Sequence, residues 1–136
     1  MRVLFISAFY PPYVVGGWEQ LVADVNARLQ DRGHTTRVLT SMYGAGSHPI
    51  REPGVDRVLH LESDVEHYDP MHFFLKRRQA VRHNLTSTRA AIQNFDPDVV
   101  FVHVMWNLTK AVPWLAKKLW PSRLIYYVAS DWPFAP

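Results

Sequence analysis

Apolar residues along the chain follow two alternating patterns, short continuous runs and longer stretches with helical spacing. The continuous runs, which are rich in β-branched and aromatic residues, are typical of strands buried on both faces of a sheet. They predict five strands at residues 3–7, 35–40, 57–61, 99–102 and 124–128. Apolar residues three or four positions apart predict helices that begin at Trp18, span residues 71–95 and end at Leu119. Strands that alternate with helices indicate a three-layer α/β domain.

The connections between these elements fix the expected order of the strands. Two strands joined through a helix should be parallel, with a right-handed crossover. We therefore expect a mainly parallel sheet with strand order 3-2-1-4-5, in which residues 41–56 form a loop. In such sheets, ligands bind beyond the carboxyl ends of the strands, near the point where the strand order reverses. The loops that meet at this edge are residues 9–17, 40–43, 103–107 and 129–132.

Two glycines, Gly16 and Gly17, stand directly before the first predicted helix. Glycines at this position can expose backbone N–H groups at the positive end of the helix, where an anion such as a diphosphate docks. A simple turn uses the same residues, so both interpretations stay open. The dinucleotide fingerprint G-x-G-x-x-G and the Walker lysine are absent, and Thr40 and Ser41 stand where an acidic ribose ligand would close the second strand.

Composition restricts the chemistry further. The chain has 136 residues, enough for one hydrophobic core, and no cysteine, which excludes disulfides, thiolate zinc sites and cysteine nucleophiles. His67, Asp69 and His72 form the one tight cluster of metal-ligand residue types, and without a further paired ligand we expect no metal site. The net charge of +3 is compatible with an anionic ligand. The sequence shows no platform of aromatic and basic residues of the kind that binds nucleic acids.

Several short motifs of the chain resemble a known enzyme family. They are Phe5-Ile6-Ser7 with Tyr10-Pro11-Pro12, Gly16-Gly17-Trp18-Glu19, Arg32-Gly33-His34, and Asp96-Pro97-Asp98-Val99-Val100 followed by Val102-His103. In these motifs the chain is similar to the N-terminal domain of GT-B fold glycosyltransferases of family four. The resemblance implies a Rossmann-like domain over residues 1–136 on the acceptor side of the enzyme, with the C-terminal donor-binding domain absent from this chain. It also implies retaining transfer from a nucleotide diphosphate sugar, without a metal or another cofactor.

The resemblance also assigns roles to residues at the expected ligand edge. Gly16, Gly17 and Glu19 match the loop that approaches the donor diphosphate, and His103 matches a histidine at the end of the fourth strand. Ser130 and Asp131 stand where many members carry His-Asp, and with His103 they are the expected catalytic residues. The candidate acceptor-binding residues in the edge loops are Tyr13, Tyr43, Trp106, Asn107 and Trp132. Their aromatic faces suit sugar C–H groups or a lipid-linked acceptor. Two alternatives to these roles stay open. His103 is then a histidine packed in the core, and the aromatic rings pack within the loops.

These observations lead to one expected function and one alternative. We expect the N-terminal part of a glycosyltransferase that transfers a sugar from a nucleotide diphosphate sugar to a hydroxyl of a glycan or lipid-linked acceptor. The isolated chain is then expected to be inactive. The alternative is a non-catalytic binding module or one half of a two-chain glycosyltransferase. The chain ends in an edge loop with Trp132 and Phe134, which favours a truncated enzyme and predicts a weak homodimer through that edge.

The sequence contains no apolar run long enough to cross a membrane, and we expect a cytoplasmic protein. Arg78, Arg82 and Arg89 form a basic flank on the long predicted helix. Such a flank is typical of a solvated face, and it also suits peripheral contact with the inner face of the membrane.

Overall fold

The computed structural model describes residues 1–46, 50–63, 65, 70–103 and 105–128. Its elements, in chain order, are β1 (Arg2–Ser7), α1 (Trp18–Asp31), β2 (Thr35–Ser41), β3 (Ile50–Glu52), β4 (Val55–Leu59), α2 (Pro70–Phe95), β5 (Val99–His103), α3 (Ala111–Leu119) and β6 (Leu124–Tyr127). Strands and helices alternate along most of the chain, as the apolar pattern predicts. The α/β class and the Rossmann-like architecture are confirmed.

The sheet has six strands in the order β3-β4-β2-β1-β5-β6. All neighbouring strands are parallel except β3 and β4, which form an antiparallel hairpin. The exact strand order therefore differs from the predicted one, because part of the predicted loop at residues 41–56 forms the additional edge strand β3. With three residues and a single apolar side chain, β3 is too short to produce a periodic signal.

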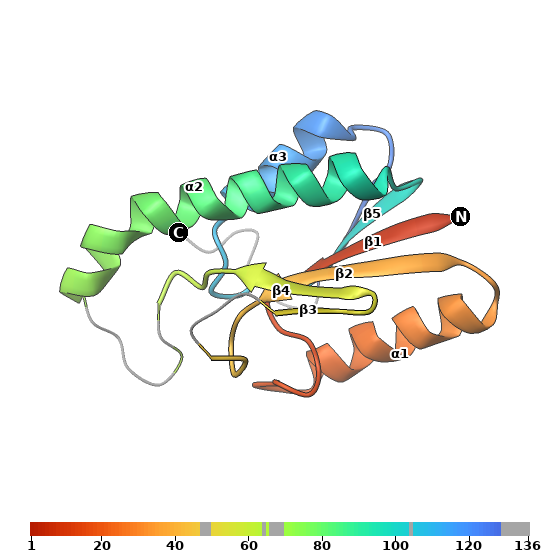
Figure 1. Ribbon diagram of the computed structural model, residues 1–136, viewed down its shortest axis with the longest axis horizontal. Coiled ribbons are helices and arrows are strands. Elements are labelled where there is room, and N and C mark those ends of the chain that lie inside the picture. Colours follow the sequence, from red (N-terminus) through yellow and green to blue (C-terminus); the bar gives the residue numbers. More distant parts are fainter. Residues whose placement is uncertain (47–49, 64, 66–69, 104, 129–136) are drawn as a thin grey trace.

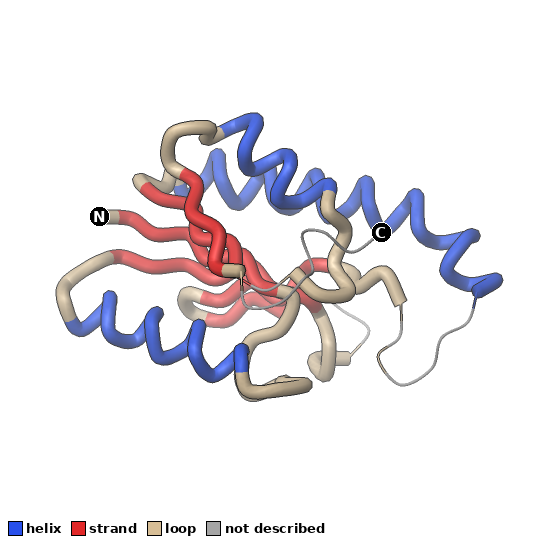
Figure 2. The backbone as a smooth tube through the Cα atoms, turned by 180° about the vertical axis from the view of Figure 1, so that it is seen from behind, coloured by secondary structure: helices blue, strands red, loops and turns tan. Residues whose placement is uncertain are grey.

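Helices cover both faces of this sheet, which gives the three layers (Figure 1). α1 lies on one face, and α2 and α3 lie together on the other, an arrangement that is also visible from behind (Figure 2). The core is divided accordingly. Leu4, Ile6 and Ile92 belong to the larger apolar cluster on the α2 side, while Phe5 and Val22 belong to the smaller cluster on the α1 side. The central strand β1 thus buries side chains on both faces, as its continuous apolar sequence predicts.

Among the helices that the structure describes, none is both long and apolar enough to span a lipid bilayer. The longest, α2, has 26 residues, but polar and basic side chains interrupt its apolar positions.

Candidate functional site

The carboxyl ends of β1, β2, β4 and β5 meet at one edge of the sheet because these strands are parallel. Phe9, which follows β1, is buried at this edge. The ring of Tyr43 meets it edge-on at 5.2 Å, and the ring of Trp106 lies 5.9 Å away at an angle of 37°. Trp106 is 50% exposed. The structure therefore brings together two of the aromatic residues that the sequence assigned to an acceptor site, and it leaves the indole partly open to solvent.

The glycine pair stands at the start of α1, with Gly17 as the residue that caps the helix. Gly17 has no side chain that could accept a hydrogen bond from the first-turn amides. Gly17 has φ −97° and ψ −13°, a conformation open to any residue, and a Cβ on it would meet nothing within 4 Å. Neither the backbone nor the packing thus requires glycine here. Its effect is to leave the positive end of the helix accessible.

Glu19 holds the loop before the helix in place. Its carboxylate Oε2 accepts a hydrogen bond from the N–H of Gly16 at 3.1 Å. The side chain is only 7% exposed, although it lies in the first turn of a helix that faces solvent on its outer side. The sequence placed Glu19 beside the donor diphosphate, and in the structure the carboxylate binds the loop backbone that precedes the helix.

His103 ends β5 and is 2% exposed. Its ring stacks on that of Tyr127 at 5.0 Å, with an angle of 5° between the two planes. Neither ring nitrogen has a hydrogen-bond partner within the part of the chain that the structure describes. Burial lowers the pKa of His103, while the negative charge of Glu19 acts in the opposite direction. His103 is therefore a neutral imidazole with two unused nitrogens near the carboxyl edge, and it stacks as a core histidine does.

Asn107, another predicted acceptor residue, has its side-chain amide engaged with a neighbouring loop. Its Oδ1 accepts hydrogen bonds from the N–H of Ser63 at 3.0 Å and from the hydroxyl of Ser63 at 2.8 Å. Its Nδ2 donates to the carbonyl of Ser63 at 2.7 Å. Asn107 thus ties the loop after β5 to the segment after β4, and contact with an acceptor stays a prediction.

The sequence analysis missed Arg57, which is the largest fully buried side chain of the described residues. It lies on β4, is 1% exposed, and donates hydrogen bonds to the carbonyls of Tyr10 at 3.0 Å and Pro11 at 2.5 Å. Glu52 on β3 balances the charge with an ion pair of 3.5 Å. An adjacent pair of opposite charges, Asp56 and Arg57, within a strand that also carries Val55, Val58 and Leu59 is the signal that could have drawn attention to it, since arginine is rarely buried without a specific partner.

The rings of Tyr10 and Tyr13 lie over the guanidinium of Arg57, with centroids 5.9 Å and 5.1 Å from its central carbon. On its other side, Tyr13 packs against Gly44, where a Cβ would clash with the tyrosine ring. Gly44 also has φ +73°, a conformation that favours glycine. The loops after β1 and β2 are thereby joined through Tyr13, which is half-buried.

The site roles assigned from the sequence all stay predictions, and the structure does not place some of the residues concerned. Ser130, Asp131 and Trp132 lie outside the described residues, as do His67 and Asp69 of the histidine cluster. Within the described ranges, no three His, Asp or Glu side chains gather in a way that could hold a metal ion.

Comparison with known proteins shows which protein family the chain matches. The chain matches the family described as Glycosyl transferase 4-like domain over residues 16–136, that is, from the glycine pair onward. No curated protein sequence matches it. The match covers most of the chain and confirms the resemblance seen in the motifs. The chain therefore belongs to the glycosyl transferase 4-like domain family.

Proposed function

We propose that this domain is the acceptor-side half of a glycosyltransferase that moves a sugar from a nucleotide diphosphate sugar to an acceptor hydroxyl. The observation that carries the proposal is the N-terminus of α1, capped by an exposed glycine, at the same sheet edge as His103, whose ring nitrogens have no hydrogen-bond partner among the described residues. Membership of the family supports it, since the glycine pair stands at the start of the matched region.

The diphosphate leaving group would lie against the first turn of α1. Unsatisfied N–H groups and the positive end of the helix stabilise negative charge, and this charge increases on the diphosphate as the sugar bond breaks. The carboxylate of Glu19 is turned to the Gly16 amide. It therefore fixes the shape of the loop while the amides that follow stay available for the ligand.

The acceptor would occupy the space beside Tyr43 and Trp106, with Tyr13 and Trp132 as further aromatic contacts. Aromatic faces at such an edge bind the C–H faces of sugars and exclude water. His103, neutral because burial lowers its pKa, can hydrogen-bond a hydroxyl either as donor or as acceptor. Ser130 and Asp131 are proposed as its catalytic partners.

Binding of the nucleotide is assigned to a second α/β domain outside these 136 residues. The proposed reaction takes place in the cleft between the two domains. On this proposal, the present chain binds a diphosphate weakly and does not turn over a nucleotide sugar.

Nuclear magnetic resonance titration of the chain with uridine diphosphate tests the central step. We expect saturable shifts at the backbone amides of residues 16–20 and at the ring of His103. Gly17→Val, which puts a branched side chain over the helix end, should abolish these shifts, and Gly17→Ala should weaken them only slightly. Both substitutions should leave the fold intact, because a Cβ at Gly17 meets open space. An absence of shifts at residues 16–20 in the unsubstituted chain would mean that the loop is only a turn, and equal shifts in all three proteins would mean that binding does not depend on an open helix end.

A further inference from the structure

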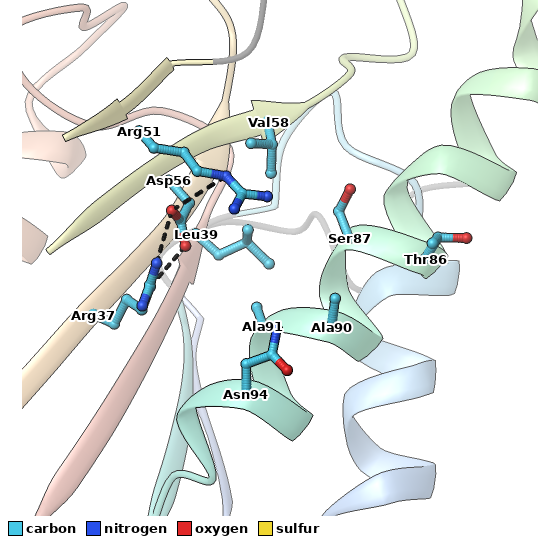
Figure 3. A pocket seen from close by; sticks show the side chains of 10 residues that line it. All are labelled: Arg37, Leu39, Arg51, Asp56, Val58, Thr86, Ser87, Ala90, Ala91 and Asn94. Atoms are coloured by element: carbon cyan, nitrogen blue, oxygen red, sulfur yellow. Dashed lines mark hydrogen bonds and ion pairs between the residues drawn. The ribbon is translucent and has the colours of Figure 1, made fainter.

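A cavity of about 250 Å³ lies between α2 and the strands β2 and β4, away from the edge described above (Figure 3). Arg37 and Asp56 line it from near the amino ends of their strands, and Asn94 lines it from the last turns of α2. The aromatic residues and glycines of the candidate site do not contribute to its walls. The cavity is therefore separate from the candidate site.

The cavity exists because α2 presents small side chains to this part of the sheet. Ser87, Ala90 and Ala91 are three and four residues apart and so share one side of the helix. Across from them stand Leu39 and Val58, which give the cavity an apolar floor. Figure 3 shows the two alanines and Ser87 on the helix side and these two aliphatic side chains on the strand side.

Two arginines on the sheet side share a single carboxylate. Asp56 is buried and accepts hydrogen bonds from Nε of Arg37 at 2.7 Å and from Nη2 of Arg37 at 3.0 Å. Arg51 is 76% exposed, and its Nε lies 3.9 Å from the same carboxylate. The side chains that face them from α2 are hydroxyls, an amide and methyl groups, none of them charged. The lining thus carries one positive charge in excess.

The position of the two guanidinium groups suits an anion inside the cavity. The bidentate contact with Asp56 fixes Arg37 and leaves its second terminal nitrogen, Nη1, outside that contact. In Figure 3 the side chain of Arg51 reaches toward Val58 on the strand side of the cavity, and Ser87 stands on the opposite wall. Donors from two walls match the tetrahedral oxygens of a phosphate, and arginine is the side chain best suited to hold them.

We propose that this cavity binds a small phosphate ester, a phosphate group on a body of a few carbon atoms. Arg37 and Arg51 would hold the phosphate oxygens, while Ser87 and Asn94 donate further hydrogen bonds. The carbon body would pack on the apolar floor. A volume of about 250 Å³ is below the range of drug-sized pockets and suits a metabolite of this size.

The test is a magnetic resonance titration of the 136-residue chain with glycerol phosphate at constant ionic strength. We expect saturable shifts at the amides of Leu39, Val58 and Ala90. Arg51→Gln should weaken binding about tenfold, the effect of one charge-assisted contact, with little effect on folding because the side chain is exposed. Ala90→Leu, which fills the cavity without a change of charge, should remove the shifts. Arg78→Gln, on an exposed part of α2, is the matched control and should bind as the wild type does.

Two results would overturn the proposal. The first is an absence of shifts around the cavity, including the case in which only residues 16–20 respond. That case would support the helix terminus as an anion site and exclude the cavity. The second is an equal loss of affinity in Arg51→Gln and Arg78→Gln, which would show attraction to the general charge of the protein. Shifts at the cavity without any at residues 16–20 would support this proposal, whatever becomes of the proposed transferase function.

Discussion

Substitution of Arg57 by methionine tests whether a buried charge holds the loop after β1 in its conformation. The change removes the guanidinium and both hydrogen bonds, to the carbonyls of Tyr10 and Pro11, and keeps much of the side-chain length. It also removes the cation beneath the rings of Tyr10 and Tyr13. Glu52 loses its partner as well, but its side chain is 44% exposed and can be hydrated.

The expected effect follows from two opposing contributions. Two hydrogen bonds from a charged donor contribute roughly 1.5–3 kcal/mol each, while removal of a buried ion recovers part of its desolvation cost. The carbonyls lie in a half-buried loop, where water can replace part of the lost interaction. We therefore expect the free energy of unfolding to fall by about 2–4 kcal/mol, a large fraction of the stability of one domain.

Urea denaturation followed by tryptophan fluorescence measures this loss. Arg51→Met is the matched control, since the same exchange at an exposed arginine of the neighbouring strand should change stability by less than about 0.5 kcal/mol. Arg57→Lys keeps the charge without the planar fork that bonds two carbonyls at once, and it should show most of the loss. The amide resonance of Gly44 should also move in Arg57→Met, because Tyr13 packs on that residue.

The explanation fails if Arg57→Met is as stable as Arg51→Met and the Gly44 resonance stays in place. Packing of the two tyrosines would then be sufficient to hold the loop. A loss of stability without any change at Gly44 would also contradict it, since the role assigned to Arg57 is local.

Three further predictions concern the whole chain. The purified chain should transfer no sugar from any of several nucleotide sugars, and turnover above background in a radiolabel assay would contradict the assignment of the donor site to another domain. Burial lowers the pKa values of His103 and His60, so both rings stay neutral in the fold and take up protons on unfolding. The contribution of these two histidines to the free energy of unfolding should be fully present above about pH 6.5 and should be lost as the pH falls toward their lowered pKa values. Denaturation at a series of pH values measures this loss, which should be smaller in His103→Phe. The chain should associate weakly through the edge that carries Tyr13 and Trp106, which sedimentation at increasing concentration would detect; a strict monomer would contradict this.

The fold was predictable where the apolar residues form a clear pattern, either a continuous run or a helical spacing. Strands buried on both faces appear as continuous apolar runs, and α1 begins at Trp18 as its spacing predicts. The errors concern the edge of the sheet. β3 is too short to have a period, and β4 begins at Val55, two residues before the predicted start. Asp56 and Arg57 are buried charges in that strand, and a pattern based on hydrophobicity cannot assign them to the interior.

The sequence predicts which loops meet at the carboxyl edge of the sheet, but not the contacts that their side chains make there. Parallel strands bring their carboxyl ends together, which is why Tyr43 and Trp106 lie beside the same ring of Phe9. The sequence does not reveal which side chains are already engaged within the fold. The amide of Asn107 is bonded to Ser63, 44 positions away, and only the folded chain brings these two residues together.

Two buried charges of opposite sign hold the loop that leads into α1. Arg57 donates to the carbonyls of Tyr10 and Pro11 at the start of the loop, and Glu19 accepts from the N–H of Gly16 at its end. Both side chains bind backbone groups, and these contacts add to the burial of Phe9 and the packing of Tyr10 against the core. Gly17 can therefore remain exposed at the helix terminus. A loop held in this way is ordered before a ligand arrives, which lowers the entropy lost on binding and suits the diphosphate site proposed above.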